Sequence, residues 1–360
     1  MRGYHMFRSY GIPESNIIVM FYDDIANSTH NPTPGIVINE RGGPDLYKGV
    51  PKDYTGKEVT PENFLAVMQG DPELAKQGKK VVNSGPNDHV FIYFGDHGST
   101  EMLMFPSTYL KASDLNKALV SMHEKHRFAE LAIYIDACES GSMFRNILAD
   151  NIKVYATSSS DYNELSWFWN WDDKYDTWLS SFFADNWLDN DETSDLKTET
   201  MQQQFQFFKE HNLVNYTHLN VTHSVHSQQY GSKPNGVINR RKAEQNNEAV
   251  SKWDAKLVSL EKRIEKTEDI NEENRLLAEL ENLYAGRKYV DKHMTEYVNS
   301  IQHLLTVDSN AILNTKQELN DRQCYETLVD TYNENCLQIS KLLVREIDSA
   351  PVGTGIGVCD

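Results

Sequence analysis

The fold is decided by the apolar stretch Leu131-Ala132-Ile133-Tyr134-Ile135, which runs directly into Asp136-Ala137-Cys138. A stretch that is apolar at every position is typical of a strand buried on both faces, as in a parallel sheet. Similar apolar stretches occupy residues 17–22, 89–94 and 153–157, and helical sequence such as Ser113 to His123 lies between them. This alternation predicts an α/β fold in which helices flank a mostly parallel sheet.

Two chemically reactive residues follow these predicted strands. Cys138 comes directly after the stretch quoted above, and His97 follows residues 89–94 and precedes Gly98. In open α/β sheets, ligands bind outside the carboxyl ends of the strands, so both residues fall where chemistry is expected. A cysteine or a histidine alone is more often an ordinary buried residue. Together, each at a strand end, they predict the Cys/His pair of a thiol hydrolase.

The local sequence around the pair suits nucleophilic catalysis. A thiol at a strand-to-helix turn can be exposed, and a helix N-terminus lowers its pKa toward the reactive thiolate. Gly98 lets backbone N–H groups approach a reacting carbonyl closely. The amides of Gly98 and Cys138 would then form an oxyanion hole, a feature that typically contributes about 3–4 kcal/mol.

Length and composition limit the other possibilities. The chain has 360 residues, which suggests about two domains. Its net charge of −18 opposes general binding to phosphate backbones, so no nucleic-acid partner is expected. No apolar run is long enough to span a membrane. Four cysteines are too few for a disulfide scaffold. The N-terminus has no signal peptide, so the protein is either cytosolic or lacks its true beginning.

Residues 161–200 differ from their surroundings. They hold five of the six tryptophans, and their eleven acids against two lysines give this window a charge of −9. One interpretation is an acidic surface loop with a partly buried aromatic cluster. The other is the wall of a cleft that holds an extended ligand.

The last third of the chain predicts a second domain. Residues 231–247 are rich in Gly, Pro, Asn, Lys and Arg, as expected of a linker. Apolar residues then recur with helical spacing from Trp253 to Leu305, which predicts amphipathic helices packed through their apolar stripes. A break at residues 268–271 separates two helical blocks.

The two reactive motifs resemble those of a known family. Phe94-Gly95-Asp96-His97-Gly98-Ser99 and the run from Tyr134 to Ser142 are similar to the active-site motifs of the legumain family of asparaginyl endopeptidases. Flanking sequence also matches, and the resemblance covers most of residues 1–232. It implies a caspase-like fold and hydrolysis of peptide bonds after asparagine, and after aspartate at lower pH. It implies no cofactor and no metal.

The resemblance also assigns roles to individual residues. It makes Cys138 the nucleophile and His97 the general acid and base, with Gly98 supplying an oxyanion amide. Asp96 matches a position that can cyclise to a succinimide and that is linked to ligase behaviour. The remaining roles concern substrate binding: the resemblance places Asp136 in the asparagine pocket and Ser166 and Trp167 on the cleft wall, and it aligns the family's later acidic pocket residue with Ser181.

The C-terminal region resembles the family's helical prodomain, which caps the active site of the precursor. We therefore expect a peptidase domain at 1–232, an activation linker at 233–271 and a prodomain at 272–360. The expected autocleavage site is Asn271, or else Asp269, and mildly acidic pH is expected to weaken charge pairs between enzyme and cap. The implied partners are protein or peptide substrates, the chain's own prodomain as inhibitor, and cystatin-type inhibitors.

The chain departs from the family pattern in three respects. The family's first strand, with an asparagine that orients the histidine and a pocket arginine, has no counterpart before Gly11. With Ser181 in place of an acid, compensation by Asp176 or Asp185 is an open alternative. The prodomain holds three cysteines where the family has four, and spacing favours a Cys324–Cys359 disulfide that leaves Cys336 unpaired. We expect a chain truncated at both ends.

Several alternatives stay open at this point. One is another enzyme of the same fold, such as the glycosylphosphatidylinositol transamidase subunit or a caspase relative. Another is a non-catalytic binding protein, since the N-terminal pocket residues are missing. A metal site at His218, His223 and His226 lacks the usual accompanying ligands. Lysosomal, vacuolar or secreted location follows from the resemblance, in which case the sequons at Asn27, Asn215 and Asn220 predict glycosylation.

Overall fold

The structure is a computed structural model that describes residues 1–211, 218–219, 249–316, 319–336 and 338–339. The described residues form two compact units, the first reaching from Met1 to Trp253 and the second beginning at Asp254. Each unit is considered by itself below. In the described part of the chain, no helix is both long and apolar enough to cross a membrane.

The first unit is built on a sheet of mostly parallel strands. Its order is β1 (His89–Gly95), β5 (Glu130–Asp136), β6 (Val154–Ser158) and β9 (His218–Leu219). The first three strands pair in parallel, whereas β9 pairs with β6 in the antiparallel direction. The α/β fold predicted from the apolar stretches is confirmed.

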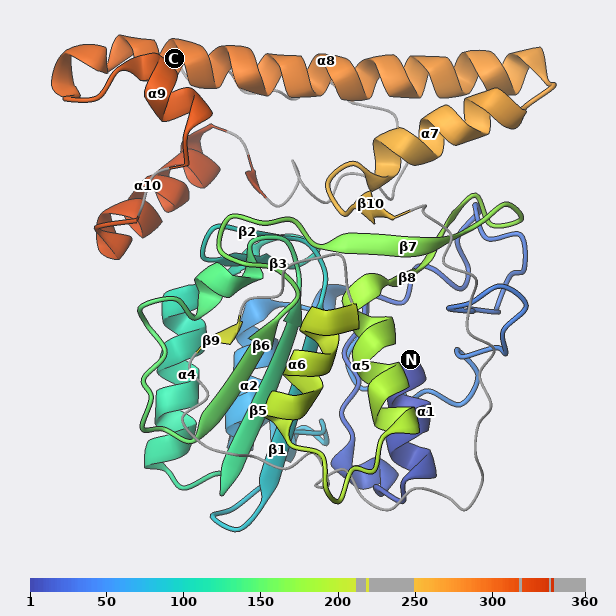
Figure 1. Cartoon of the computed structure of the whole chain (residues 1–360), viewed down its shortest axis with the longest axis vertical. Coiled ribbons are helices and arrows are strands. Elements are labelled where there is room, and N and C mark those ends of the chain that lie inside the picture. Colours follow the sequence, from blue (N-terminus) through green and yellow to red (C-terminus); the bar gives the residue numbers. More distant parts are fainter. Residues whose placement is uncertain (212–217, 220–248, 317–318, 337, 340–360) are drawn as a thin grey trace. The chain divides into compact units, whose positions relative to one another are not determined.

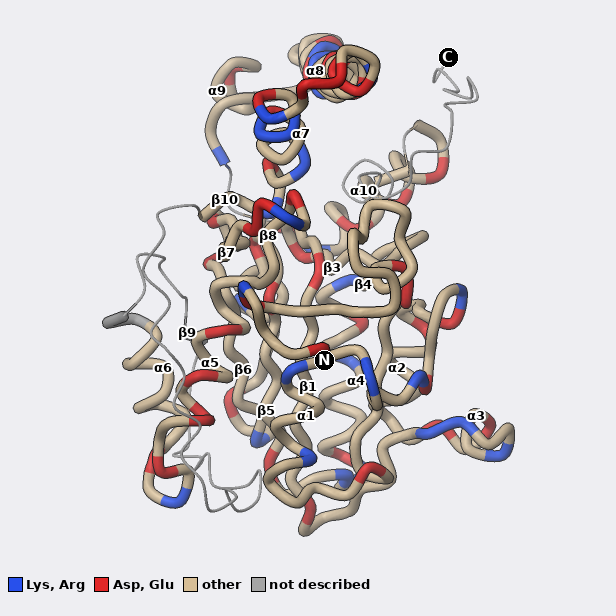
Figure 2. The backbone as a smooth tube through the Cα atoms, turned by 90° about the vertical axis from the view of Figure 1, so that its right-hand side faces the viewer, with Lys and Arg blue, Asp and Glu red and all other residues tan. Residues whose placement is uncertain are grey.

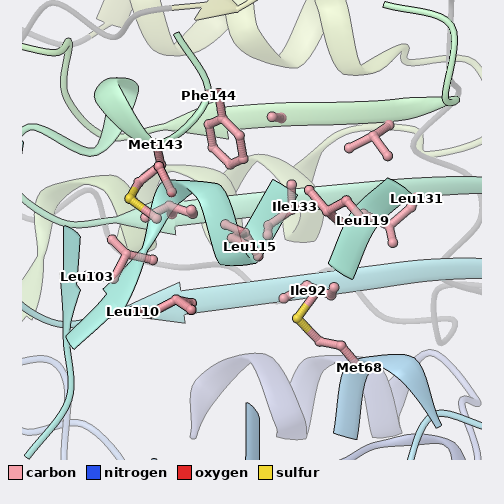
Figure 3. Packing of buried hydrophobic residues seen from close by; sticks show 14 of the residues in the cluster. Met68, Ile92, Leu103, Leu110, Leu115, Leu119, Leu131, Ile133, Met143 and Phe144 are labelled. Atoms are coloured by element: carbon pink, nitrogen blue, oxygen red, sulfur yellow. The ribbon is translucent and has the colours of Figure 1, made fainter. Parts of the chain in front are cut away.

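Helices cover both faces of this sheet (Figure 1). One face packs against α2 (Pro61–Gln69) and α4 (Ala112–Glu124). The other packs against α1 (Arg2–Ser9), α5 (Phe182–Thr193) and α6 (Met201–His211). Figure 3 shows the core of the first face, where leucines of α4 meet the side chains of β1 and β5. The sheet is therefore the middle layer of three.

The pattern of burial along the strands reflects their positions. Every residue of β5 after Glu130 is buried, and so is all of β6, because both strands have neighbours on each side. β1 lies at the end of the described sheet and alternates between buried and exposed residues, with Tyr93 39% exposed. Residues 17–22 do not form the predicted strand: only Met20 makes a β-bridge, to Tyr54. An apolar run forms a strand only where a neighbouring strand can pair with it, and residues 17–22 lie next to a loop instead.

Two small antiparallel sheets lie in the same unit. One contains β2 (Gly98–Ser99), β3 (Met102–Met104) and β4 (Tyr109–Lys111). The other has β7 (Trp167–Asp172) in the middle, between β10 (Val250–Ser251) and β8 (Thr177–Ser181). This second sheet is the aromatic, acidic window of the sequence. Its Trp171 and Trp178 rings meet edge to face with centroids 4.6 Å apart.

The second unit is helical, as predicted. It contains α7 (Ala255–Lys266), α8 (Ile270–Ser300), α9 (Ser309–Asn314) and α10 (Arg322–Asn335). The predicted break falls between α7 and α8, and α7 groups with the later helices rather than with the linker. The remaining short helices are α3 (Pro72–Lys76), η1 (Glu14–Asn16), η2 (Gly56–Glu58), η3 (Ser140–Met143) and η5 (Gln302–Leu304).

The predicted Cys324–Cys359 disulfide is wrong. Cys324 is an exposed free thiol, whereas Cys336 is disulfide-bonded. The two cysteines lie at opposite ends of α10, roughly 18 Å apart along the helix. At this separation, Cys324 and Cys336 cannot both lie within disulfide distance of the same third cysteine. The spacing of cysteines along the sequence does not show which of the two forms the bond.

Candidate active site

The register of the sheet brings the two reactive motifs to the same edge. Gly95 of β1 is directly paired with Asp136 of β5, and the backbone N–H of Asp96 donates to the carbonyl of Asp136 at 3.2 Å. His97 and Cys138 then follow these paired residues by two positions each. The carboxyl ends of parallel strands lie at the same edge of a sheet, so Cys138 and His97 both lie at that edge.

The turn that carries Cys138 is tightly constrained. Glu139, the residue after the cysteine, has a φ of 53° in the left-handed region, which is uncommon for a residue with a side chain. Its N–H donates to the carbonyl of Glu164 at 2.8 Å, and η3 begins at Ser140. Such strained positions persist only where the surrounding structure enforces them, and they cluster at functional sites.

Gly98 provides the close approach between the two motifs. A Cβ atom at this position would lie 2.4 Å from the backbone oxygen of Cys138 and 2.9 Å from the Cβ of Ala137. No side chain can fit there, so only glycine lets the backbone after His97 lie against the backbone of Cys138. The role predicted for Gly98, to supply an amide to the oxyanion hole, stays a prediction.

The Cys138 thiol is fully buried and protonated in this state. Burial raises its pKa to about 11, although the N–H of Ser166 donates to the sulfur at 3.4 Å and the Lys252 ammonium acts in the opposite direction. A lowered pKa was expected from the position before a helix. It is not realised because burial disfavours the thiolate more than its neighbours stabilise it.

His97 is uncharged in this state as well. Burial, together with the smaller effect of the Lys252 positive charge, lowers the pKa of its imidazole to about 4. Its Nδ1 atom is buried and has no hydrogen-bond partner within the described residues. The nitrogen that usually receives an orienting contact is therefore not held by this part of the chain.

Four side chains converge on the buried carboxylate of Asp136. Oδ1 accepts hydrogen bonds from the hydroxyl of Ser166 and the ammonium of Lys252, each at 2.8 Å. Oδ2 accepts from the hydroxyls of Ser181 and Tyr93. We call Asp136, Ser166, Ser181, Tyr93 and Lys252 the Asp136 cluster. It unites three of the residues predicted to bind substrate, from β5, the start of β7 and the end of β8.

Lys252 is the cluster member that the sequence analysis did not identify. It follows β10, and its side chain is 3% exposed beside the 1% exposed carboxylate. The ammonium also donates to the backbone carbonyl of Asp136 at 2.7 Å. No local motif marks this lysine, because its partner lies 116 residues earlier. Tyr93 was also missed, because within the sequence it resembles the other apolar residues of its strand.

The cluster settles the charge of Asp136. Burial alone would raise the pKa of this carboxyl, but the Lys252 ammonium and the hydroxyls of Ser181 and Ser166 outweigh it and lower the pKa. The lysine and the aspartate therefore form a desolvated ion pair. Breaking such a pair by removing one partner leaves an uncompensated buried charge.

The other predicted residues of this unit lie around the cluster. Trp167 begins β7 and pairs with Ser251. Burial of its carboxyl group among protein atoms raises the pKa of Asp96 to about 6, although the residue as a whole is exposed to solvent. Asp185 accepts a hydrogen bond from the Trp169 indole at 2.7 Å. Burial, followed by the charge of Asp136 and then that of Asp185, raises the pKa of Tyr93. Asp176 lies in the turn at the far end of β8, so Asp185 is the nearer alternative acid.

The remaining predicted sites are dispersed. Asp269 and Asn271 are exposed at the start of α8, where Asp269 caps the helix. Asn27 is exposed, as glycosylation requires, whereas Asn215 and Asn220 lie outside the described residues, as do Cys359, His223 and His226. Within the described ranges, no group of three or more His, Cys, Asp or Glu is arranged to hold a metal ion.

Comparisons with known proteins identify relatives of this chain. Residues 1–237 match the family model described as the peptidase C13 family. The chain is 37% identical over 350 residues to legumain of Bos taurus and to legumain of Homo sapiens, covering 92% of this chain and 78% of each relative. It is 33% identical over 379 residues to the vacuolar-processing enzyme of Vicia sativa, covering 96% of this chain and 76% of that protein.

Proposed function

Because this chain belongs to the peptidase C13 family, and is therefore a cysteine endopeptidase, we propose that it cleaves peptide bonds after asparagine, and after aspartate at lower pH. One observation carries the residue assignment: Cys138 and His97 each follow, by two residues, the end of one of two strands in direct register, and Gly98 lies against the cysteine backbone. The family's caspase-like fold uses this sheet edge for catalysis, and no cofactor is needed.

In the proposed mechanism, Cys138 Sγ attacks the carbonyl carbon of the scissile bond. His97 accepts the thiol proton and passes it to the departing amine, and water then releases the acyl group. The amides of Gly98 and Cys138 stabilise the oxyanion. A neutral thiol and a neutral imidazole, as found here, describe the site before substrate has entered.

The proposed substrate preference follows from Asp136. An asparagine amide can donate a hydrogen bond to its carboxylate. An ionised aspartate would be repelled by the same group, whereas a protonated aspartic acid can donate in place of the amide. Cleavage after aspartate should therefore grow as pH falls. Ser166, Trp167 and Ser181 complete this side of the proposed binding site.

We further propose that the chain is a precursor that activates itself at acidic pH in a lysosomal or vacuolar compartment. Its support is that Cys138 is 0% exposed, so substrate can reach the sulfur only after part of the chain moves. The proposed cleavage site is Asn271 or Asp269, which releases the helical prodomain. That prodomain and cystatin-type proteins are the proposed inhibitors.

Thiol labelling tests the proposal directly. In the intact chain, an iodoacetamide probe should label exposed Cys324 and not buried Cys138. After incubation at mildly acidic pH, Cys138 should become reactive and an asparagine peptide should be hydrolysed. Cys138→Ala should abolish hydrolysis, and His97→Ala should lower it roughly a thousandfold.

Cys324→Ala is the matched control, because it removes the other free thiol of the described chain without touching the site. It should retain full hydrolysis. An acid-treated chain whose Cys138 labels but which cleaves no asparagine peptide would favour a non-catalytic binding protein instead.

A further inference from the structure

The backbone N–H of Cys138 is left unpaired although the residue is buried. Cys138 is 0% exposed, and its N–H has no acceptor among the described residues. Two later amides of the same turn are paired: Glu139 donates to the carbonyl of Glu164 at 2.8 Å, and Gly141 donates to the carbonyl of Ser160 at 3.0 Å. Buried N–H groups nearly always have a partner, so this one is open to an acceptor that arrives with substrate.

The direction of this N–H depends on the carbonyl of the same peptide group. The N–H of Cys138 and the C=O of Ala137 belong to one planar trans peptide, in which the two bonds point in opposite directions. The hydroxyl of Ser160 donates a hydrogen bond to the Ala137 carbonyl oxygen at 2.8 Å. Because this hydrogen bond holds the carbonyl on one side of the turn, it also aims the N–H of Cys138 toward the other side.

A second hydroxyl lies near the same carbonyl but has a nearer acceptor. Ser159 Oγ is 3.2 Å from the carbonyl oxygen of Ala137 and 2.9 Å from Ser166 Oγ. A hydroxyl group has a single proton to donate, and the shorter contact is the one to Ser166, whose own proton goes to Asp136. Ser160 is therefore the main donor to the Ala137 carbonyl.

Ser160 also holds the chain that follows the nucleophile. Its Oγ accepts the N–H of Ser140 at 3.1 Å, and its carbonyl accepts the N–H of Gly141 at 3.0 Å. The fit is close, since a Cβ added to Gly141 would lie 3.0 Å from that carbonyl oxygen. Ser160 is 0% exposed, so bulk water is not at hand to replace its hydroxyl. One buried residue thus binds the main chain on both sides of Cys138.

We propose that Ser160 is a positioning residue for catalysis, whose hydroxyl orients the N–H of Cys138 toward the oxyanion that forms when the sulfur attacks the substrate carbonyl. Ser160 acts through the peptide between Ala137 and Cys138 and not through contact with substrate. This inference rests on the endopeptidase activity proposed above. Complete removal of an oxyanion donor typically costs about a hundredfold to a thousandfold in kcat, so a misdirected donor should cost about tenfold to a hundredfold.

The first test separates stabilisation of the oxyanion from reactivity of the thiol. In acid-processed enzyme, Ser160→Ala should lower kcat for an asparagine peptide about tenfold to a hundredfold and leave KM within about twofold, because the oxyanion exists only in the transition state. Iodoacetamide alkylates the sulfur by displacing iodide, a reaction that forms no oxyanion, so labelling of Cys138 should stay within about twofold of the parent rate. Ser160→Cys keeps a weak donor of similar size and should restore part of kcat. Equal losses in hydrolysis and labelling would overturn the inference.

Ser158→Ala is the matched control, because it removes an equally buried hydroxyl from the end of β6, one that donates to the carbonyl of Ser160 at 2.9 Å. Both variants lose one buried hydrogen bond, and the melting temperature of each shows whether their stability costs are alike. Only Ser160→Ala should lose kcat to the stated degree. A similar loss in Ser158→Ala would mean that any missing hydroxyl beneath the turn slows the reaction, which would contradict a specific role of Ser160.

A further measurement needs neither processing nor turnover. The full chain is labelled with ¹⁵N-cysteine, and the amide signal of Cys138 is identified by its loss in Cys138→Ala. An amide signal responds to the hydrogen bond on the carbonyl of its own peptide, so Ser160→Ala should move the Cys138 signal and leave that of Cys324 in place. An unmoved Cys138 signal would overturn the inference, whereas a parent chain that cleaves no peptide would refute the proposed function instead.

Discussion

At the scale of single residues, Gly98 is the most constrained position of the site. Gly98→Ala would place a Cβ 2.4 Å from the Cys138 carbonyl oxygen, so the two motifs must move apart. We expect a loss of activity of at least a hundredfold and a stability cost of about 1–3 kcal/mol, typical of forced overpacking. Urea unfolding and peptide hydrolysis measure the two effects.

A second glycine provides the control for this substitution. Gly286 lies within α8, and apart from its chain neighbours and the adjacent backbone of the helix itself, no atom of the described residues lies within 4 Å of an added Cβ. Gly286→Ala should therefore stabilise the helix by up to about 1 kcal/mol and leave activity unchanged. If Gly98→Ala behaved like Gly286→Ala, the close approach described here would be incorrect.

Asp185 makes a prediction about pH at the same scale. Burial raises its pKa to about 6 despite the nearby Arg2 guanidinium, whereas an unfolded aspartate titrates near about 3.9. The folded protein therefore takes up this proton more readily as pH falls from about 6 to about 4, and the contribution of Asp185 to the free energy of unfolding should rise by on the order of 2 kcal/mol, whereas His97, with its lowered pKa, acts in the opposite direction. Asp185→Asn should flatten this rise in urea titrations at several pH values.

Asp189→Asn is the matched control, since Asp189 lies on the same helix and contacts the same arginine but is half exposed. It should leave most of the pH dependence in place. The Asp136 carboxyl acts in the opposite direction, because its lowered pKa makes its stabilisation disappear only as pH falls below the range of a normal aspartate. If Asp185→Asn had the same pH dependence of stability as the parent chain between about pH 6 and about pH 4, the assignment of Asp185 would be contradicted, because His97, whose lowered pKa acts in the opposite direction, is the same in both.

At the scale of elements, the start of α8 controls the proposed processing site. Asp269 is the N-cap and accepts the N–H of Asn271 at 2.8 Å, which places Asn271 in the first helical turn. A peptidase binds an extended chain, so this turn must open before cleavage after Asn271. Asp269→Ala removes the cap, destabilises the turn by about 1 kcal/mol and should speed that cleavage severalfold.

The control for this prediction is Asp269→Ser, because serine caps a helix about as well as aspartate and is not a proposed cleavage residue. Intact mass over time at acidic pH distinguishes the products that end at Asp269 or Asn271. If Asp269→Ala were processed no faster than Asp269→Ser, opening of α8 would not limit the reaction.

Local patterns were sufficient for the central elements. The runs that became β1, β5 and β6 are apolar at nearly every position, and Cys138 and His97 directly follow two of them. Residues 17–22 have the same pattern but no neighbouring strand. The position of Lys252 beside Asp136 and the disulfide pairing of the cysteines depend on contacts between segments far apart in the sequence. The pKa of Cys138 depends on how deeply its turn is buried. None of these is encoded in a short window of sequence.

At the scale of the whole molecule, the two units differ in how much they bury. The first unit has two apolar clusters, one on each face of its sheet. In α8, only Leu276 and Val298 are buried, and the rest of the helix carries both acidic and basic residues, as the red and blue segments of its end-on view in Figure 2 show. Local stability follows buried apolar contact, so α8 should be the less protected element.

Hydrogen exchange of the intact chain tests this difference. Backbone amides of β5 and β6 should exchange at least a hundredfold more slowly than those in the middle of α8. Comparable protection in both would mean that α8 is covered in solution to a degree that its own unit does not explain.

The direct pairing of Gly95 with Asp136 has a consequence for partly folded chains. A slip of β1 by a single residue would displace His97 by about 3.3 Å and turn its side chain toward the opposite face. Hydrolytic competence is therefore all-or-none with respect to strand alignment. A chain emerging from synthesis would stay harmless to its surroundings until this alignment is complete, whether or not any inhibitor is yet in position.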